Sequence, residues 1–133
     1  MNTTRVSPAA NGVLPLFARI AIAAIFLLSG LSKLTAPAGT IGYIASAGLP
    51  LPEVGYAIAL LVEIVGGLLL VVGYRTRIVA AALALFTVAA AIFFHNSLGD
   101  QNEFIHFFKN LAIAGGLLQV VAFGAGRLSF DKN

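Results

Sequence analysis

Glu63 lies near the middle of an apolar run, residues 57–72, that is long enough to cross a lipid bilayer. A carboxylate at the bilayer centre costs about 2.5–3.5 kcal/mol, and such residues usually face a bundle interior, a partner or a substrate path. The surrounding Ile, Leu and Val residues each return roughly 0.3–0.6 kcal/mol, so the run can still insert. Glu63 is therefore the first candidate for chemistry, as a group that pairs with a cation or transfers a proton.

Three of the predicted helices each carry polar residues at three- or four-residue spacing, which places those residues on one helix face. A rise of about 1.5 Å per residue puts Arg19 and Lys109 at depths from which both side chains reach Glu63. The pattern predicts a polar pocket, open to the outer side or to lipid, in which Glu63 and Lys109 carry the chemistry. The predicted ligand-binding residues are Arg19, Lys33, His95, His106 and Asn110.

Glycines accompany these polar positions on the same three helices. Small residues let neighbouring helices approach closely in a membrane, which would bring a partner helix near the carboxylate. We interpret them as packing positions rather than ligand contacts: Gly30, Gly66, Gly67, Gly115 and Gly116.

Structural readings of the same residues stay open. Glu63 with Arg19 or Lys109 could be an ion pair between helices with no function beyond neutralising an intramembrane charge. His95 and His106 would permit a bis-His haem b, which nothing else in the sequence favours. The phenylalanines of residues 93–108 fit an aromatic belt at the membrane interface, although several could flank a flat quinone ring.

Composition limits the class of protein. The chain has 133 residues, 59% of them hydrophobic and 10% charged, which indicates a membrane protein. It has no cysteine, which excludes thiolate nucleophiles, disulfide exchange and iron–sulfur clusters carried by the chain itself. We predict no metal site, and the small net charge of +3 does not suggest nucleic acid as a partner.

Four apolar runs predict an all-α membrane protein with a four-transmembrane-helix bundle. They cover residues 14–34, 54–72, 78–94 and 104–123, and about 17–25 residues are needed to span the hydrocarbon. The first run is too long for a signal peptide, and a small-residue cleavage site lies well past its end, so we predict an uncleaved helix. The chain then divides into a polar N-terminal tail (1–13), a membrane domain (14–124) and a C-terminal tail (125–133).

Charged residues outside the runs predict the orientation. Lys and Arg are enriched in cytoplasmic loops, and the basic residues at 5, 75, 77, 127 and 132 all fall on one side of a four-pass topology. Both termini should therefore be cytoplasmic. The loop of residues 35–52, which is apolar enough to lie on the bundle or in the interface, and the loop of residues 95–102 should face outward.

Several motifs together resemble the DoxX family of small bacterial membrane proteins. The motifs are FLLSGLSK at 26–33, GLP at 48–50, EIVGG at 63–67, GYRTR at 73–77, FKNL at 108–111 and GRLSFD at 126–131. The resemblance implies a four-helix protein of the bacterial inner membrane, loosely linked to oxidoreduction through relatives that act as subunits of thiosulfate:quinone oxidoreductase. The positions that look like the family's polar motif are Arg19, Gly30, Lys33, Glu63, His95, Lys109 and Asn110.

Three functions compete at this stage. The first is a redox-associated subunit that binds a quinone or other small ligand near Glu63, while a partner protein supplies electrons; whether the chain is itself an enzyme is left open. The second is a small proton-coupled transporter. The third is a scaffold or assembly subunit without chemistry. Besides the lipid bilayer, the expected partners are a redox protein or further copies of the chain.

Overall fold

The computed structural model describes residues 8–131, and all the regular secondary structure in this range is helical. Within it, four helical segments are long and apolar enough to cross a membrane: Val13–Thr35, Pro52–Val72, Thr76–Phe94 and Gln101–Phe123. The predicted four-span, all-α architecture is confirmed. The elements are α1 (Pro8–Asn11), α2 (Val13–Thr35), α3 (Pro37–Ser46), α4 (Pro52–Leu60), a π-helical turn (Leu61–Val65), α5 (Gly66–Val72), α6 (Thr76–Phe94) and α7 (Gln101–Phe123).

Local sequence sets where these helices begin and end. Proline occupies the first position of both α3 and α4, where its fixed φ suits the helix and its missing N–H is not needed. Gly73 ends α5 in the left-handed region at φ 73°, which a glycine adopts without steric cost. Asp100 caps α7 by accepting hydrogen bonds from the backbone N–H groups of Asn102 and Glu103.

The second span is interrupted at its centre. Residues Leu61–Val65 form a π-helical turn between α4 and α5, and Glu63 is the middle residue of that turn. Single π turns inside α-helices are uncommon and often occur at functional sites. The extra residue of the π turn rotates the side chains around the helix axis, so the turn sets the orientation of Glu63.

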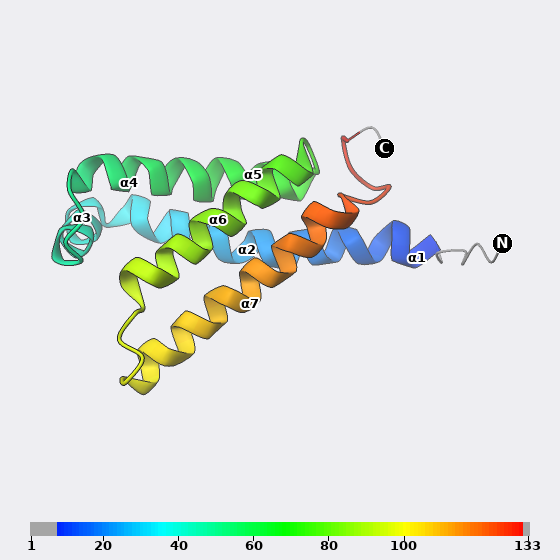
Figure 1. The fold of residues 1–133 in the computed structure, drawn as a ribbon. Coiled ribbons are helices and arrows are strands. Elements are labelled where there is room, and N and C mark those ends of the chain that lie inside the picture. Colours follow the sequence, from blue (N-terminus) through cyan, green and yellow to red (C-terminus); the bar gives the residue numbers. More distant parts are fainter. Residues whose placement is uncertain (1–7, 132–133) are drawn as a thin grey trace.

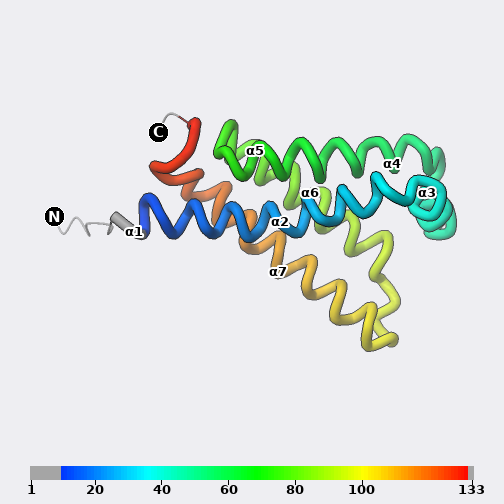
Figure 2. The backbone as a smooth tube through the Cα atoms, turned by 180° about the vertical axis from the view of Figure 1, so that it is seen from behind, coloured from blue at the N-terminus to red at the C-terminus, as the bar shows by residue number. Residues whose placement is uncertain are grey.

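The spans form two hairpins (Figure 1). In one, α2 packs against α5, the π turn and, less extensively, α4; in the other, α6 packs along α7. The hairpins meet at the end that holds Val13, Val72, Thr76 and Phe123, which we call the terminal end. Toward the opposite end, the loop end, they diverge: α6 contacts α5 and the π turn but not α4. Figure 2 shows α1 and the C-terminal segment after α7 at the terminal end.

The core between the hairpins is built from small and branched side chains. Ala23, Leu70, Leu83 and Leu117 are fully buried there. Many large apolar side chains, such as Leu85 at 73% exposure, instead point outward from the helices. An apolar outer surface of this kind suits contact with acyl chains, so the helices satisfy their backbone internally and present hydrocarbon to lipid.

The stretch predicted as a loop between the first two spans contains α3. The helix forms because Pro37 starts it favourably, and Ile44 on one face is buried against the bundle. Packing of α3 against α4 holds it at the loop end, where Figure 1 shows it beside the ends of α2 and α4. We predicted that this stretch could lie on the bundle, and the structure shows that it also forms a helix. Its prolines and glycines had obscured that helix in the sequence.

The C-terminal segment after α7 packs against the terminal end. Asp131 accepts hydrogen bonds from the backbone N–H groups of Arg75 (2.6 Å) and Thr76 (2.9 Å), so it caps the start of α6 from a distance in sequence. Arg75 takes a left-handed conformation at φ 49°, and the α6 terminus has no side-chain cap of its own. The tail therefore closes the bundle at this end.

Candidate functional site

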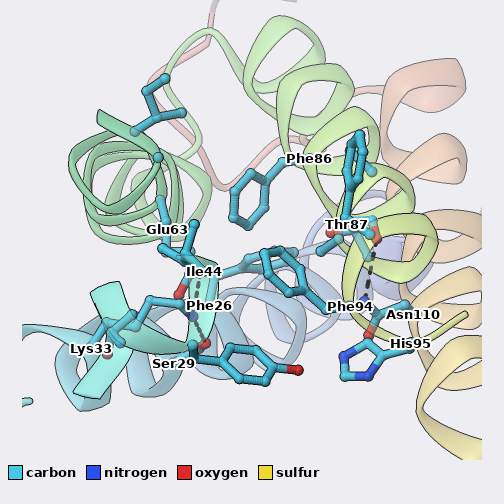
Figure 3. Close-up of a pocket in the computed structure, with 18 of the residues that line it drawn as sticks. Phe26, Ser29, Lys33, Ile44, Glu63, Phe86, Thr87, Phe94, His95 and Asn110 are labelled. Carbon is cyan, nitrogen blue, oxygen red and sulfur yellow. Dashed lines mark hydrogen bonds and ion pairs between the residues drawn. The ribbon is translucent and has the colours of Figure 1, made fainter. Parts of the chain in front are cut away.

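A cavity of about 520 Å³ lies between the diverging hairpins, toward the loop end. Ligand pockets in proteins typically measure about 300–1,000 Å³ and combine apolar walls with a few polar groups. Figure 3 shows aromatic rings around the space, with polar groups at two separate places in its wall. The residues that line it include Phe26, Ser29, Lys33, Tyr43, Ile44, Glu63, Phe86, Thr87, Phe93, Phe94, His95, Asn110 and Ile113.

The first polar place is a network of three side chains from α2 and the π turn. The Nζ of Lys33 lies 2.8 Å from Oε1 of Glu63 and also donates to Oγ of Ser29 at 2.8 Å. Lys33 and Ser29 are four residues apart, so both side chains lie on the same face of α2. The side chain of Glu63 is 3% exposed and that of Lys33 28% exposed. The carboxylate is therefore inside the protein, and the cation approaches it from the cavity side.

The second oxygen of Glu63 is not satisfied. Among residues 8–131, no group donates a hydrogen bond to its Oε2, which is buried. A buried acceptor without a donor costs about 1–3 kcal/mol, and more when it is charged. Since Glu63 lines the cavity, a ligand there could supply the missing donor.

Close helix packing brings Lys33 and Glu63 together. A Cβ added at Gly30 would lie 2.6 Å from Cγ1 of Ile64 and 3.3 Å from Cβ of Glu63, so only glycine allows α2 this close to the π turn. The hydroxyl of Tyr56 donates to the backbone carbonyl of Lys33 at 2.8 Å and ties α4 to the end of α2.

The other predicted packing glycines differ among themselves. Gly66 and Gly67 face Leu83 and Leu27 at distances that leave little room for a Cβ, 3.1 Å and 2.9 Å. Gly116 has ordinary contact with Ile22 at 3.5 Å. No atom lies within 4 Å of the Cβ position at Gly115, so this glycine does not serve packing between the described parts of the chain.

The second polar place lies on the α6–α7 hairpin. The Nδ2 of Asn110 donates to the backbone carbonyl of Thr87 at 3.3 Å. His95 also lines the cavity, and its Nδ1 lies 3.0 Å from Oε2 of Glu103. Figure 3 shows Asn110 and His95 across the cavity from Lys33 and Glu63. A ligand between the hairpins would therefore meet polar groups on two sides.

His106 contributes only indirectly. Its ring stacks on that of His95 with centroids 5.2 Å apart and is not part of the cavity wall. A bis-His haem needs its two rings on opposite faces of the porphyrin. Because these two rings contact each other, the geometry does not fit that group.

Arg19 lies at the terminal end, away from Glu63, although its depth along the first span predicted that its side chain would reach the carboxylate. Its guanidinium donates to the carbonyls of Leu70 (2.9 Å), Val71 (2.9 Å), Ala125 (3.0 Å) and Leu128. The side chain is 1% exposed. Arg19 thus donates to carbonyls at the end of α5 and in the C-terminal segment. Its depth in the membrane could not predict that these carbonyls lie nearer to it than the carboxylate of Glu63.

Lys109 does not reach Glu63 either. Its side chain is exposed on α7 and is absent from the cavity wall, whereas the neighbouring Asn110 faces inward. The expectation fails because α7 diverges from α2 and α5, so that similar depth does not bring side chains together. The cation beside Glu63 is Lys33 instead.

The structure adds wall residues that the spacing of polar residues did not single out. Thr87 is buried on α6 and positions Asn110, and Phe86 lines the space beside it. Tyr43 of α3 stacks on Phe94 with ring centroids 5.3 Å apart. Burial, followed by the nearby charge of Glu103, raises the pKa of the Tyr43 phenol above its ordinary value of 10.0.

Metal-ligand geometry is not evident in the described range. Within residues 8–131, no group of three or more His, Cys, Asp or Glu side chains is placed to hold a metal ion. The candidate site is therefore defined by the cavity and its two polar places.

Comparison with known proteins identifies the family. The chain is 37% identical to the Escherichia coli (strain K12) inner membrane protein YphA over 99% of both chains, and 36% identical to inner membrane protein YqjF of the same organism over 88% of both. It is also 40% identical, over 58% of this chain and 56% of the other, to a Bacillus subtilis (strain 168) protein named "Putative oxidoreductase CatD". No solved structure matches it significantly. The DoxX family model matches residues 14–96, and with full-length relatives among inner membrane proteins, the chain belongs to the DoxX family.

Proposed function

We propose that this DoxX-family protein is a redox-associated subunit of the bacterial inner membrane that binds a quinone-type ring in the cavity between its hairpins. The observation that carries the proposal is an apolar, aromatic-walled cavity of about 520 Å³ with one ion pair, Lys33–Glu63, in its wall. Aromatic walls accommodate a flat ring, and the few polar groups fix its orientation.

The route of entry supports a lipid-soluble ligand. The cavity lies where α6 diverges from the second span, beside α4, and the outer faces of these helices are apolar. A molecule dissolved in the hydrocarbon would reach this space without crossing water. The polar head of such a molecule would leave the lipid and form hydrogen bonds with Lys33, Glu63 or Asn110.

Glu63, with Lys33 beside it, would handle one of the two protons that accompany a change in the ligand's redox state, and the partner protein would exchange the second proton together with the electrons. Interconversion of a quinone and a quinol transfers two electrons and two protons. A carboxylate beside an ammonium can accept a proton from a ligand hydroxyl and return it. The chain contains no cysteine, so we assign the electrons to a partner protein rather than to thiol chemistry of this chain. The name of the CatD relative is consistent with this class of function.

We further propose that both termini face the cytoplasm. The terminal end, where α1 and the C-terminal segment after α7 lie, carries Arg75, Arg77 and Arg127, and short cytoplasmic segments are enriched in such residues. The cavity, near the loop end, then opens in the outer half of the membrane.

Ligand binding to purified protein tests the proposal. A benzoquinone with a decyl tail is titrated into the wild type and a Lys33→Met/Glu63→Leu double variant in detergent, and affinity is followed by fluorescence quenching or calorimetry. The double variant keeps the site apolar and folded, because a buried ion pair can be replaced by hydrophobic residues at little cost. We expect saturable binding to the wild type and at least about tenfold weaker binding to the double variant, about 1.4 kcal/mol.

Lys109→Met is the matched control for this experiment. It also removes one lysine from the membrane domain, but from an exposed position outside the cavity. Its affinity should equal that of the wild type. Loss of binding in the control, or equal binding in all three proteins, would place the ligand elsewhere and refute the assignment to this cavity.

A further inference from the structure

The hydrogen-bonding capacity of the Lys33–Glu63 pair is used unevenly. An ammonium has three N–H donors. Lys33 directs one at Glu63 Oε1 and one at Ser29 Oγ, so one donor remains. A carboxylate has no donors and accepts at both oxygens. No residue in the described part of the chain donates to Glu63 Oε2. The pair thus leaves a buried acceptor open.

Burial makes the open acceptor more important than the remaining donor. The side chain of Lys33 is 28% exposed and lines the cavity, so its spare N–H can donate to solvent or to any ligand oxygen, quinone or quinol, whereas the side chain of Glu63 is 3% exposed. An unsatisfied group costs most where the local dielectric is low and no solvent reaches it. The ligand that fits this site best therefore brings an O–H or N–H to Glu63.

Resting on the proposed function, we infer that the cavity selects the reduced, hydroxyl-bearing form of its ligand, a quinol, over the corresponding quinone. The two oxygens of a quinone only accept hydrogen bonds, so a quinone would leave Glu63 Oε2 unsatisfied and place a second acceptor beside it. The hydroxyl of a quinol donates to that oxygen. Sites built to hydrogen-bond a hydroxyl reject analogues that lack it strongly, because their buried polar group is then left without a partner.

The opposite wall carries a second acceptor. Asn110 uses one N–H of its Nδ2 to donate to the Thr87 carbonyl, so its carboxamide oxygen can accept from a ligand and its second N–H can donate to one. Figure 3 shows Asn110 and Glu63 on opposite sides of the cavity. One acceptor on each side of an aromatic-walled space matches a ring with hydroxyls at opposite positions, as in a 1,4-quinol.

Three ligands with one ring and one decyl tail test the inference on the wild-type protein. They are the 1,4-benzoquinone, its quinol, and the dimethyl ether of the quinol, which keeps the ring and both oxygens but has no donor. Titrations are run without oxygen so that the quinol stays reduced. We expect the quinol to bind at least about tenfold more tightly than either other ligand, about 1.4 kcal/mol.

Glu63→Gln tests the assigned acceptor. Because Lys33 only donates, the glutamine would turn its carbonyl oxygen toward Lys33 and place its NH₂ where Oε2 lies now. The acceptor becomes a donor, so the preference for the quinol should disappear or reverse toward the quinone. Lys109→Met, away from the cavity, should keep the preference of the wild type.

The outcomes separate this inference from the proposed function. Quinone or ether binding as tight as the quinol on the wild type would overturn the selectivity while leaving a quinone-type site in place. Binding of none of the three ligands would overturn both. If Glu63→Gln fails to give a folded protein by thermal melting, the wild-type comparison of the three ligands decides on its own.

Discussion

Lys33 turns its ammonium inward from the loop end of α2 and places it 2.8 Å from Oε1 of Glu63 in the π turn of the second span. A lysine near a helix end usually extends toward the membrane surface instead. The inward direction is supported by Ser29, which accepts a second hydrogen bond at 2.8 Å. The pair thus joins the first two spans at the cavity wall and neutralises the intramembrane carboxylate.

Breaking this pair from one side should destabilise the protein. Lys33→Met leaves Glu63 buried without its cation, and removing one partner of a buried pair costs about 3–5 kcal/mol. We expect a loss near the lower end of that range, because Lys33 is only partly buried. Thermal unfolding in detergent, followed by circular dichroism, measures the effect.

The double variant Lys33→Met/Glu63→Leu provides the comparison. It removes both charges and should recover most of the stability lost in Lys33→Met. A double variant as unstable as the single one would show that Lys33 stabilises the bundle through packing, independently of Glu63.

Glycine substitution should separate packing from propensity. Gly30→Ala introduces a Cβ 2.6 Å from Ile64, and forcing extra volume into a packed contact typically costs about 1–3 kcal/mol. Gly115→Ala is its matched control in another span, since nothing lies within 4 Å of its Cβ position. The control should leave the unfolding temperature unchanged or raise it slightly, because alanine favours helix by up to about 1 kcal/mol. Equal destabilisation by both variants would contradict the close approach of α2 to the π turn.

The spans themselves follow from sequence because bilayer thickness fixes the length of each apolar run. All four predicted runs lie within helices of the structure, and the boundaries differ by a few residues at most. The helix α3 was missed because Pro37 and neighbouring glycines read as breaks, although a proline at the first helical position is favourable. The π turn had no signal in the apolar pattern, since one extra residue barely changes hydropathy.

The partner of Glu63 was harder to predict. Depth along each helix is accessible from sequence, but rotation, tilt and competing carbonyl acceptors are not. Arg19 met the depth criterion, yet the carbonyls of Leu70 and Ala125 take its donors. Lys109 met it too, yet α7 turns that residue outward. Lys33 was among the predicted ligand-binding residues, and the close approach of the two spans at Gly30 brings it within ion-pair distance of Glu63.

Asp131 should make stability depend on pH at the acidic end. Burial alone would raise its pKa, but hydrogen bonds from Thr76 and from the backbone N–H of Arg75, with the charge of Arg19, hold the pKa below its ordinary value of 3.8. The unfolded chain then binds more protons than the folded one in this window, so the contribution to stability is complete above the unfolded value. It is lost as the pH falls from there through the folded pKa.

Unfolding temperatures measured from neutral pH down to about pH 2 check this expectation against Asp131→Asn. The variant should be less stable at neutral pH by about 0.5–1.5 kcal/mol, because its amide keeps one acceptor oxygen where the carboxylate accepts two hydrogen bonds. It should also lack part of the wild type's acid dependence. Parallel curves for the two proteins would mean that Asp131 keeps an ordinary pKa in the folded state.

Arg19→Lys should weaken the terminal end without affecting the cavity. A lysine cannot reproduce the planar fork that serves four carbonyls, and each hydrogen bond from a charged donor is worth about 1.5–3 kcal/mol. We expect about 2–4 kcal/mol of lost stability and faster hydrogen exchange in residues 125–131, with ligand affinity unchanged. Weaker ligand binding at unchanged stability would restore the role first predicted for Arg19.

Reporter fusions should find the terminal end in the cytoplasm. Four spans place both chain ends on one side, and the turn between α5 and α6, which holds Arg75 and precedes Arg77 at the start of α6, lies at the terminal end. Green fluorescent protein fused after residue 133 should fluoresce, and alkaline phosphatase fused there should be inactive. Phosphatase inserted within residues 96–100, at the loop end, should be active. The opposite pattern would place the cavity in the inner half of the membrane, and ligand entry, proton exchange and any electron donor would then have to be assigned to the cytoplasmic side.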